Sequence, residues 1–126
     1  MVISDNNNKP IYLVIADRII DEILSGKIHP EERLLSIRDY AAEVQVNHNT
    51  VKRTYDYLAD QGLIFNLRGV GYYVDPEAIK KGKSLRTRQL LGNELDKIFR
   101  QLQLLGVTPE ELTERYIEFI KTDKLK

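Results

Sequence analysis

The chain of 126 residues contains no cysteine and no apolar run of the roughly 18 residues that a membrane-spanning helix needs. Without cysteine it can form neither a disulfide framework nor a thiolate metal site, and the composition fits a reducing compartment. The first residues, MVISDNNNK, lack the apolar stretch of a signal peptide. We therefore expect a cytoplasmic protein that has no membrane partner.

The sequence also lacks the basic excess of many nucleic-acid-binding proteins, because 19 Lys and Arg balance 19 Asp and Glu. These charges are unevenly distributed. Residues 1–75 carry 8 basic and 11 acidic side chains, whereas residues 76–100 carry 7 basic and 3 acidic ones. Any anion-binding surface in the first part must therefore arise from local sorting of charge. Residues 44–55 are such a place, since they hold Lys52, Arg53 and the titratable His48 without any acid.

Signatures of catalysis are missing as well. The chain has 2 histidines, His29 and His48, which form no ligand pair such as H-x-x-x-H, and no phosphate loop or nucleophile elbow occurs. Gly69 and Gly71 lie between two expected strands instead of opening a helix, so they form no dinucleotide motif. An enzyme is therefore the weakest interpretation, and we expect no cofactor and no metal.

Helical periodicity is clear in the first part of the chain. Apolar residues recur at helical spacing between Pro10 and Gly26, a typical C-terminal cap. Ser36-Ile37-Arg38-Asp39 fits a variant of the capping box that opens a short second helix. Asn47 is a good N-cap for a third helix, which Gly62 would end.

Two β-like runs follow the third helix. Residues 63–67 and 72–74 are rich in apolar and aromatic side chains, and Arg68-Gly69-Val70-Gly71 joins them as a hairpin turn. Residues 33–35, before the second helix, are expected to be extended. The order helix, helix, turn, helix, hairpin predicts an α+β, mainly α fold, with a winged helix-turn-helix in residues 1–75.

Residues 76–126 are predicted to form a separate, two-helix region. After a hinge at residues 80–83, a long amphipathic helix is expected to end near Gly106, and Thr108-Pro109-Glu110-Glu111 is a capping box for the last helix. Two helices bury a wide apolar stripe poorly by themselves, so the stripe must pack on the first domain, on another copy, or both. We favour the core of a homodimer, formed by Leu91, Leu95, Ile98, Phe99, Leu102, Leu105, Leu112, Tyr116 and Ile120.

The start of the third helix is the strongest candidate for a DNA-binding surface. A recognition helix enters the major groove with its N-terminal residues at base edges, so short polar side chains belong first and cations follow. Asn49 can pair with adenine, Thr50 can meet a phosphate or a thymine methyl, and Lys52 and Arg53 can reach phosphates or guanine. Taken singly, Asn47 also fits a plain cap and the cations a solvated face, but their consecutive placement favours DNA.

Two other places carry candidate contacts. Arg38 stands near the start of the second helix, which normally crosses the DNA backbone, although a surface ion pair explains it equally well. Arg68, with Gly69 beside it, forms a hairpin tip that could place a cation in the minor groove, while the glycines also suit the turn alone.

Three stretches carry a known family pattern: "PIYLVIADRIIDEILSGKI", "ERLLSIRDYAAEVQVNHNTVKRTYDYLADQGLI" and "RGVGYYV". With them, residues 10–74 resemble the DNA-binding domain of the GntR family of bacterial transcriptional regulators. The resemblance implies that Gly69 is the wing tip and that six residues occupy DNA-contact positions: Arg38, His48, Asn49, Thr50, Lys52 and Arg68.

The chain departs from the family pattern at three places. Leu34-Leu35-Ser36 replaces the usual Leu-Pro-Ser, and Glu31 replaces the usual glycine after proline, which implies a looser turn there. Asn47-His48 replaces the usual Ser-Arg, which removes a guanidinium from a base-reading position. The operator sequence therefore cannot be borrowed from relatives.

The short C-terminal part resembles the YtrA-like subfamily, whose members carry a small helical dimerisation region and often control transporter genes. About 50 residues follow Pro76, too few to enclose a metabolite within one chain, so any effector is unknown and a cleft between two chains stays open. We expect a homodimeric repressor that binds double-stranded operator DNA. The alternative, a winged-helix module for protein contacts, is motivated by the net acidic first domain.

Overall fold

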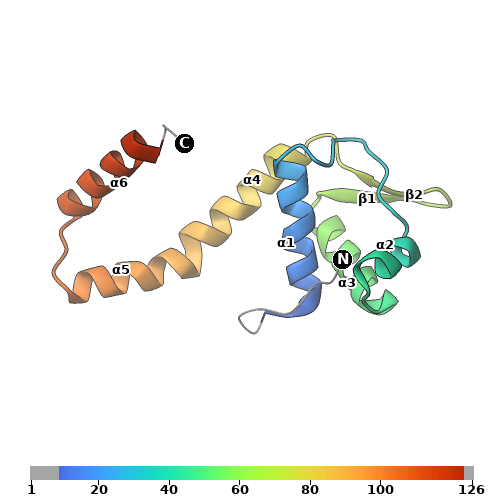
Figure 1. The fold of residues 1–126 in the computed structure, drawn as a ribbon, viewed down its shortest axis with the longest axis horizontal. Coiled ribbons are helices and arrows are strands. Elements are labelled where there is room, and N and C mark those ends of the chain that lie inside the picture. Colours follow the sequence, from blue (N-terminus) through green and yellow to red (C-terminus); the bar gives the residue numbers. More distant parts are fainter. Residues whose placement is uncertain (1–8, 124–126) are drawn as a thin grey trace. The chain divides into compact units, whose positions relative to one another are not determined.

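The computed structural model of the chain describes residues 9–123 (Figure 1). The chain forms two compact units that divide between Arg86 and Thr87, whereas the sequence placed the boundary after Asp75. Among the described residues, no helix combines the length and the apolar character needed to cross a membrane.

The first unit contains three helices and a two-stranded sheet. The helices are α1 (Ile11–Leu24), α2 (Ile37–Val44) and α3 (His48–Asp60), and the antiparallel strands are β1 (Ile64–Leu67) and β2 (Gly71–Val74). In the hairpin, Ile64 lies opposite Val74 and Leu67 lies opposite Gly71. Arg33 forms an isolated antiparallel bridge with Tyr73, so the segment before α2 is extended as predicted. These elements confirm the predicted winged helix-turn-helix.

The predicted caps form where the sequence placed them. Ser36 Oγ accepts a hydrogen bond from the Asp39 amide at 3.1 Å, and Asn47 Oδ1 accepts one from the Asn49 amide at 2.7 Å. Gly62 follows α3 with φ 76°, a left-handed conformation that glycine adopts without steric cost. Local hydrogen bonds therefore fix where the two helices of the helix-turn-helix begin.

The helical region that follows the hairpin is not continuous. The chain passes from α4 (Ala78–Gln89) through a π-helical segment, η1 (Leu90–Glu94), into α5 (Leu95–Leu104), and α6 (Pro109–Asp123) follows. The prediction of one long helix was wrong, because Gly92 leaves helical geometry with φ −87° and ψ −121°. Glycine weakens a helix interior by roughly 1 kcal/mol relative to alanine, and no neighbouring side chain restrains it here. Thr108 caps the last helix as predicted, since the Glu111 amide donates to Thr108 Oγ1 at 3.2 Å.

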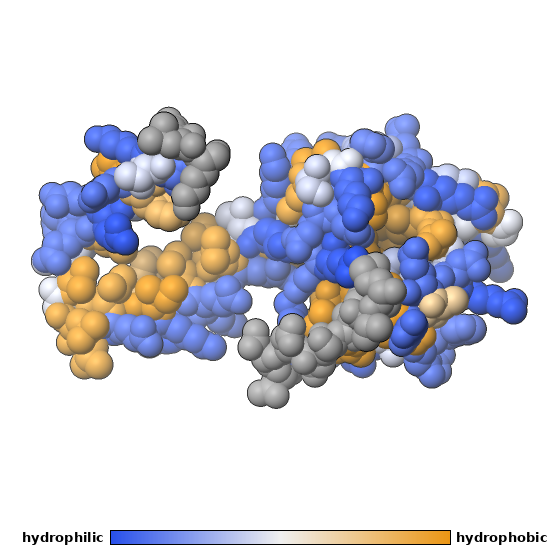
Figure 2. All heavy atoms as spheres, in the orientation of Figure 1, coloured by the Kyte–Doolittle hydropathy of each residue, from blue (hydrophilic) through white to orange (hydrophobic). Residues whose placement is uncertain are grey.

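No residue between 87 and 123 is buried within the chain. Figure 2 shows hydrophobic residues gathered along α5. Ile98 is 51% exposed and Phe99 is 43% exposed, while Tyr116 on α6 is 65% exposed. The apolar side chains of α5 and α6 therefore lack the cover that a core would give them.

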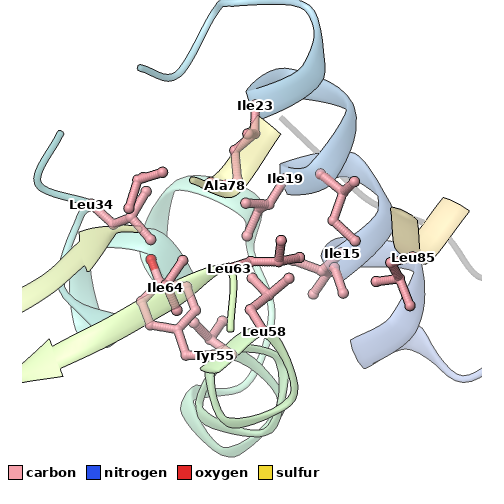
Figure 3. Packing of buried hydrophobic residues seen from close by; sticks show 14 of the residues in the cluster. Ile15, Ile19, Ile23, Leu34, Tyr55, Leu58, Leu63, Ile64, Ala78 and Leu85 are labelled. Atoms are coloured by element: carbon pink, nitrogen blue, oxygen red, sulfur yellow. The ribbon is translucent and has the colours of Figure 1, made fainter. Parts of the chain in front are cut away.

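A single hydrophobic core holds the first unit together (Figure 3). Ile15, Ile19 and Ile23 of α1 share this core with Leu58 of α3, and all four are at most 1% exposed. Burying each such side chain contributes roughly 1.5–3 kcal/mol. The core also includes Ala78 and Leu85 of α4, at 0% and 7% exposed, so α4 begins as part of this unit.

The predicted hinge at residues 80–83 was wrong, because this stretch lies within α4. Gly82 is buried, and a methyl group built there would lie 3.2 Å from Leu24 Cδ2 and 3.8 Å from Ile20 Cγ2. The absence of a side chain at Gly82 therefore allows α4 to lie close against α1, and the same glycine that suggested flexibility serves packing instead.

The turn at residues 29–32, where a looser geometry was predicted, is closed by a hydrogen bond. The Glu32 amide donates to the His29 carbonyl at 3.1 Å, and Glu31 adopts a left-handed conformation with φ 68°. Pro30 at the second position and a positive φ at the third are typical of a type II turn, which favours glycine at that third place. Glu31 therefore adopts a turn conformation that favours glycine, at a steric cost.

Replacing Glu31 with glycine should stabilise the protein. We expect Glu31→Gly to raise the free energy of unfolding by about 0.5–1 kcal/mol, because relief of left-handed strain outweighs the added freedom of the unfolded chain. Urea unfolding followed by circular dichroism measures the change. Glu32→Gly is the matched control and should destabilise the chain, since Glu32 accepts a hydrogen bond from the His29 amide and has no positive φ. Equal effects of the two variants would contradict the strain at Glu31.

Candidate nucleic-acid interface

The helix α3 has one fully buried face and one polar, exposed face. Val51, Thr54, Tyr55 and Leu58 are at most 1% exposed and point into the core. The opposite side presents the candidate residues: Asn47, His48, Asn49, Lys52 and Arg53 are exposed, and Thr50 is half-buried. The structure thus brings the six candidates on this helix together on its accessible surface.

Two polar groups on the buried side fix the position of α3. The Thr54 hydroxyl lies 2.9 Å from the Tyr12 carbonyl of α1 and 3.0 Å from the Thr50 carbonyl, so its proton is shared between two acceptors. The Tyr55 hydroxyl donates to the Leu35 carbonyl at 2.8 Å. Burial raises the pKa of Tyr55, which keeps this hydroxyl a neutral donor. These bonds tie α3 to α1 and to the segment before α2.

The two cations of α3 are held by partners that the sequence pattern did not predict. Lys52 Nζ lies 3.1 Å from Asp56 Oδ2, one helical turn later, and this hydrogen bond, followed by the charge of Asp56, raises the pKa of Lys52. The guanidinium of Arg53 lies 4.0 Å from the centre of the Tyr12 ring, a cation–π contact. The i, i+4 spacing could have revealed Asp56, but no local pattern links Arg53 to Tyr12.

The remaining candidates lie on α2 and on the hairpin. Arg38 is exposed at the second position of α2, and its side chain has no hydrogen bond or ion pair with any residue in the range 9–123. Arg68 and Gly69 are exposed at the hairpin tip, where the Val70 amide donates to the Leu67 carbonyl at 2.9 Å. Gly69 has φ 78°, so its lack of a side chain serves the turn itself.

The geometry is that of a helix-turn-helix with a hairpin wing, and its sequence matches a family model. The model described as "Bacterial regulatory proteins, gntR family" covers residues 11–74. The chain belongs to the GntR family.

Three relatives extend the match beyond the GntR domain. The HTH-type transcriptional repressor YtrA of Bacillus subtilis is 30% identical, over 96% of this chain and 92% of its own. The uncharacterised HTH-type transcriptional regulator YhcF of the same organism is 34% identical, over 86% and 88%. A solved GntR-family regulator from Bacteroides thetaiotaomicron is 45% identical with a TM-score of 0.80, covering 90% of this chain and 99% of that one. The protein is therefore a YtrA-like transcriptional regulator of the helix-turn-helix, DNA-binding class.

Removal of Asp56 tests whether the ion pair on α3 limits DNA affinity. We expect Asp56→Asn to free Lys52 for a phosphate and so to raise the affinity for duplex DNA. The slope of log K against log[salt] should then become steeper by about 0.9. Fluorescence anisotropy titrations over a series of salt concentrations measure both quantities.

Asp60→Asn is the matched control, because it removes the same charge one turn further along the exposed face of α3. It should leave the salt dependence nearly unchanged. Identical shifts in both variants would mean that net charge alone, not the Lys52–Asp56 pair, sets the affinity.

Proposed function

We propose that this GntR-family regulator is a cytoplasmic, homodimeric repressor that binds a palindromic operator. The observation that carries the proposal is the accessible polar start of α3, where Asn47, His48 and Asn49 are exposed while the far side of the helix is fully buried. A rigid helix with short polar side chains at its N-terminus suits the major groove.

The roles of the individual side chains follow from their chemistry. Asn49 and Thr50, with His48, would discriminate bases, and the Asn47 side chain caps the helix that presents them. Phosphate affinity would come from the cations Lys52, Arg53, Arg38 and Arg68, with Gly69 allowing a close approach of the wing.

The homodimer is supported by the second unit. Leu91, Leu105, Leu112 and Ile120 are between 37% and 76% exposed, as are Ile98, Phe99 and Tyr116, while Leu95 and Leu102 are half-buried. Exposed apolar patches of this extent mark interaction surfaces. A groove lined by Phe99, Leu102, Pro109 and Leu112 offers a place for side chains of a second copy.

Repression is supported by the relative YtrA, which is named a repressor and matches along 92% of its length. The net acidic first part of the chain favours the second candidate, a winged-helix module for protein contacts. Selection of bound duplexes from a random pool separates the two. Two inverted half-sites about 34 Å apart, or a multiple of that distance, would support a dimeric DNA reader. A folded protein that enriches no sequence at low salt would favour the protein-contact module.

Two substitutions separate base reading from phosphate binding. We expect Asn49→Ala to lose discrimination at one base pair, with a cost of about 1–3 kcal/mol for the preferred operator. Arg38→Ala should weaken binding to all sequences. It should also reduce the slope of log K against log[salt], in magnitude, by about 1. Titrations against the selected operator and a scrambled duplex measure both effects. An unchanged affinity and salt slope in Arg38→Ala would remove that residue from the interface.

A charge on the apolar face of α5 tests the dimer. We expect Ile98→Asp to raise the dimer dissociation constant at least about tenfold, because an unpaired carboxylate would have to be buried at the interface. Sedimentation equilibrium measures the dissociation constant. Gln101→Asp adds the same charge to an exposed polar position of α5 and should leave the dimer intact. A wild-type chain that stays monomeric at high concentration would contradict the proposal.

A further inference from the structure

Arg33 connects the segment before α2 to the wing. Its backbone bridges Tyr73 of β2, and the Leu34 amide beside it donates to the Tyr72 carbonyl at 2.9 Å. The segment therefore lies along β2 like a short third strand. From there the Arg33 side chain reaches the hairpin turn, where Nη2 donates to the Val70 carbonyl.

The guanidinium also fills the space that Gly71 leaves open. A methyl group built on Gly71 would lie 3.0 Å from Arg33 Nε and 3.1 Å from Nη2, closer than side chains normally approach. Gly71 has φ 149°, which also favours glycine. The Arg33 guanidinium thus covers the wing at Gly71, where the strand has no side chain.

The turn that Arg33 holds is the one that carries Arg68. Residues 67–70 are all exposed and have no cover from the core, and the hydrogen bond from the Val70 amide to the Leu67 carbonyl closes the turn. A hairpin tip with a glycine at its centre loses conformational freedom when it binds a ligand, unless contacts within the free protein already restrict it. The bond from Arg33 to the Val70 carbonyl is such a contact, and its donor carries a full charge.

We propose that Arg33 is a positioning residue for the wing: it orders the tip in the free protein so that Arg68 is presented to DNA. The proposal rests on the proposed function, since it requires the wing to meet DNA. Arg33 acts through the Val70 carbonyl and the space above Gly71, and it need not touch a phosphate itself. This role differs from that of Arg38, which has no partner among the described residues and is free to bind the DNA backbone.

A double-mutant cycle in the full chain tests the proposal. Arg33→Ala should weaken binding to the selected operator about tenfold in the wild-type background, but less than about twofold in an Arg68→Ala background. Arg33→Lys keeps the charge but lacks the planar fork, so it should lose most of the same affinity. A direct phosphate contact predicts the opposite: Arg33→Lys would bind well, and Arg33→Ala would still lose affinity in the Arg68→Ala background. The slope of log K against log[salt] would fall there, in magnitude, by about 1 more.

The free protein supplies an independent measurement. Arg33→Ala should lower the ¹⁵N order parameters of the Gly69 and Val70 amides from a rigid value near 0.85 to below about 0.6, without changing those of α3. Order parameters that do not change, or equal affinity losses in both backgrounds, would overturn the proposal. If the wild-type chain enriched no duplex, the proposed function would fail, and the order parameters would still decide whether Arg33 orders the tip.

Discussion

The packing of α3 against α1 is the constraint on which the rest of the structure depends. The exposed face of α3 can meet DNA in a fixed orientation only if the helix does not rotate. Rotation would expose Val51 or Leu58, which are both fully buried in the core. Thr54 adds a directional restraint, because its hydroxyl needs the Tyr12 carbonyl at 2.9 Å. Hydrophobic burial is not directional, whereas a buried hydrogen bond is, so together they fix both the depth and the rotation of the helix.

The first unit could be predicted from sequence because its signals are local. Ser36 and Asn47 mark helix starts by hydrogen bonds that span two or three residues, and Gly62 marks an end through its backbone conformation. The periodicities of the helices and strands then predict which faces are buried. Accordingly, the fold, the family and the exposure of the polar residues on α3 all followed from patterns that each lie within one segment of the chain.

What could not be predicted depends on contacts between distant segments. Gly82 was interpreted as part of a hinge because the sequence does not show that Leu24 lies against it. Gly92 interrupts a helix that periodicity alone would continue, since no packing there offsets the cost of glycine. The sequence predicted only that Arg33 lies in an extended segment, because 37 residues separate it from the carbonyl that it binds. The first and third cases depend on a neighbour that is distant in sequence, and the second depends on the lack of one.

The ion pair between Lys52 and Asp56 affects how long the regulator stays bound to DNA of random sequence. Attraction to random DNA is almost wholly electrostatic, whereas attraction to the correct site adds base contacts. A cation that is already paired at 3.1 Å weakens the phosphate contacts that both kinds of binding share and leaves the base contacts unchanged. With an excess of acidic side chains in residues 1–75, the protein would leave wrong sequences quickly. Its total affinity would therefore be lower and its dissociation during the search of the chromosome faster.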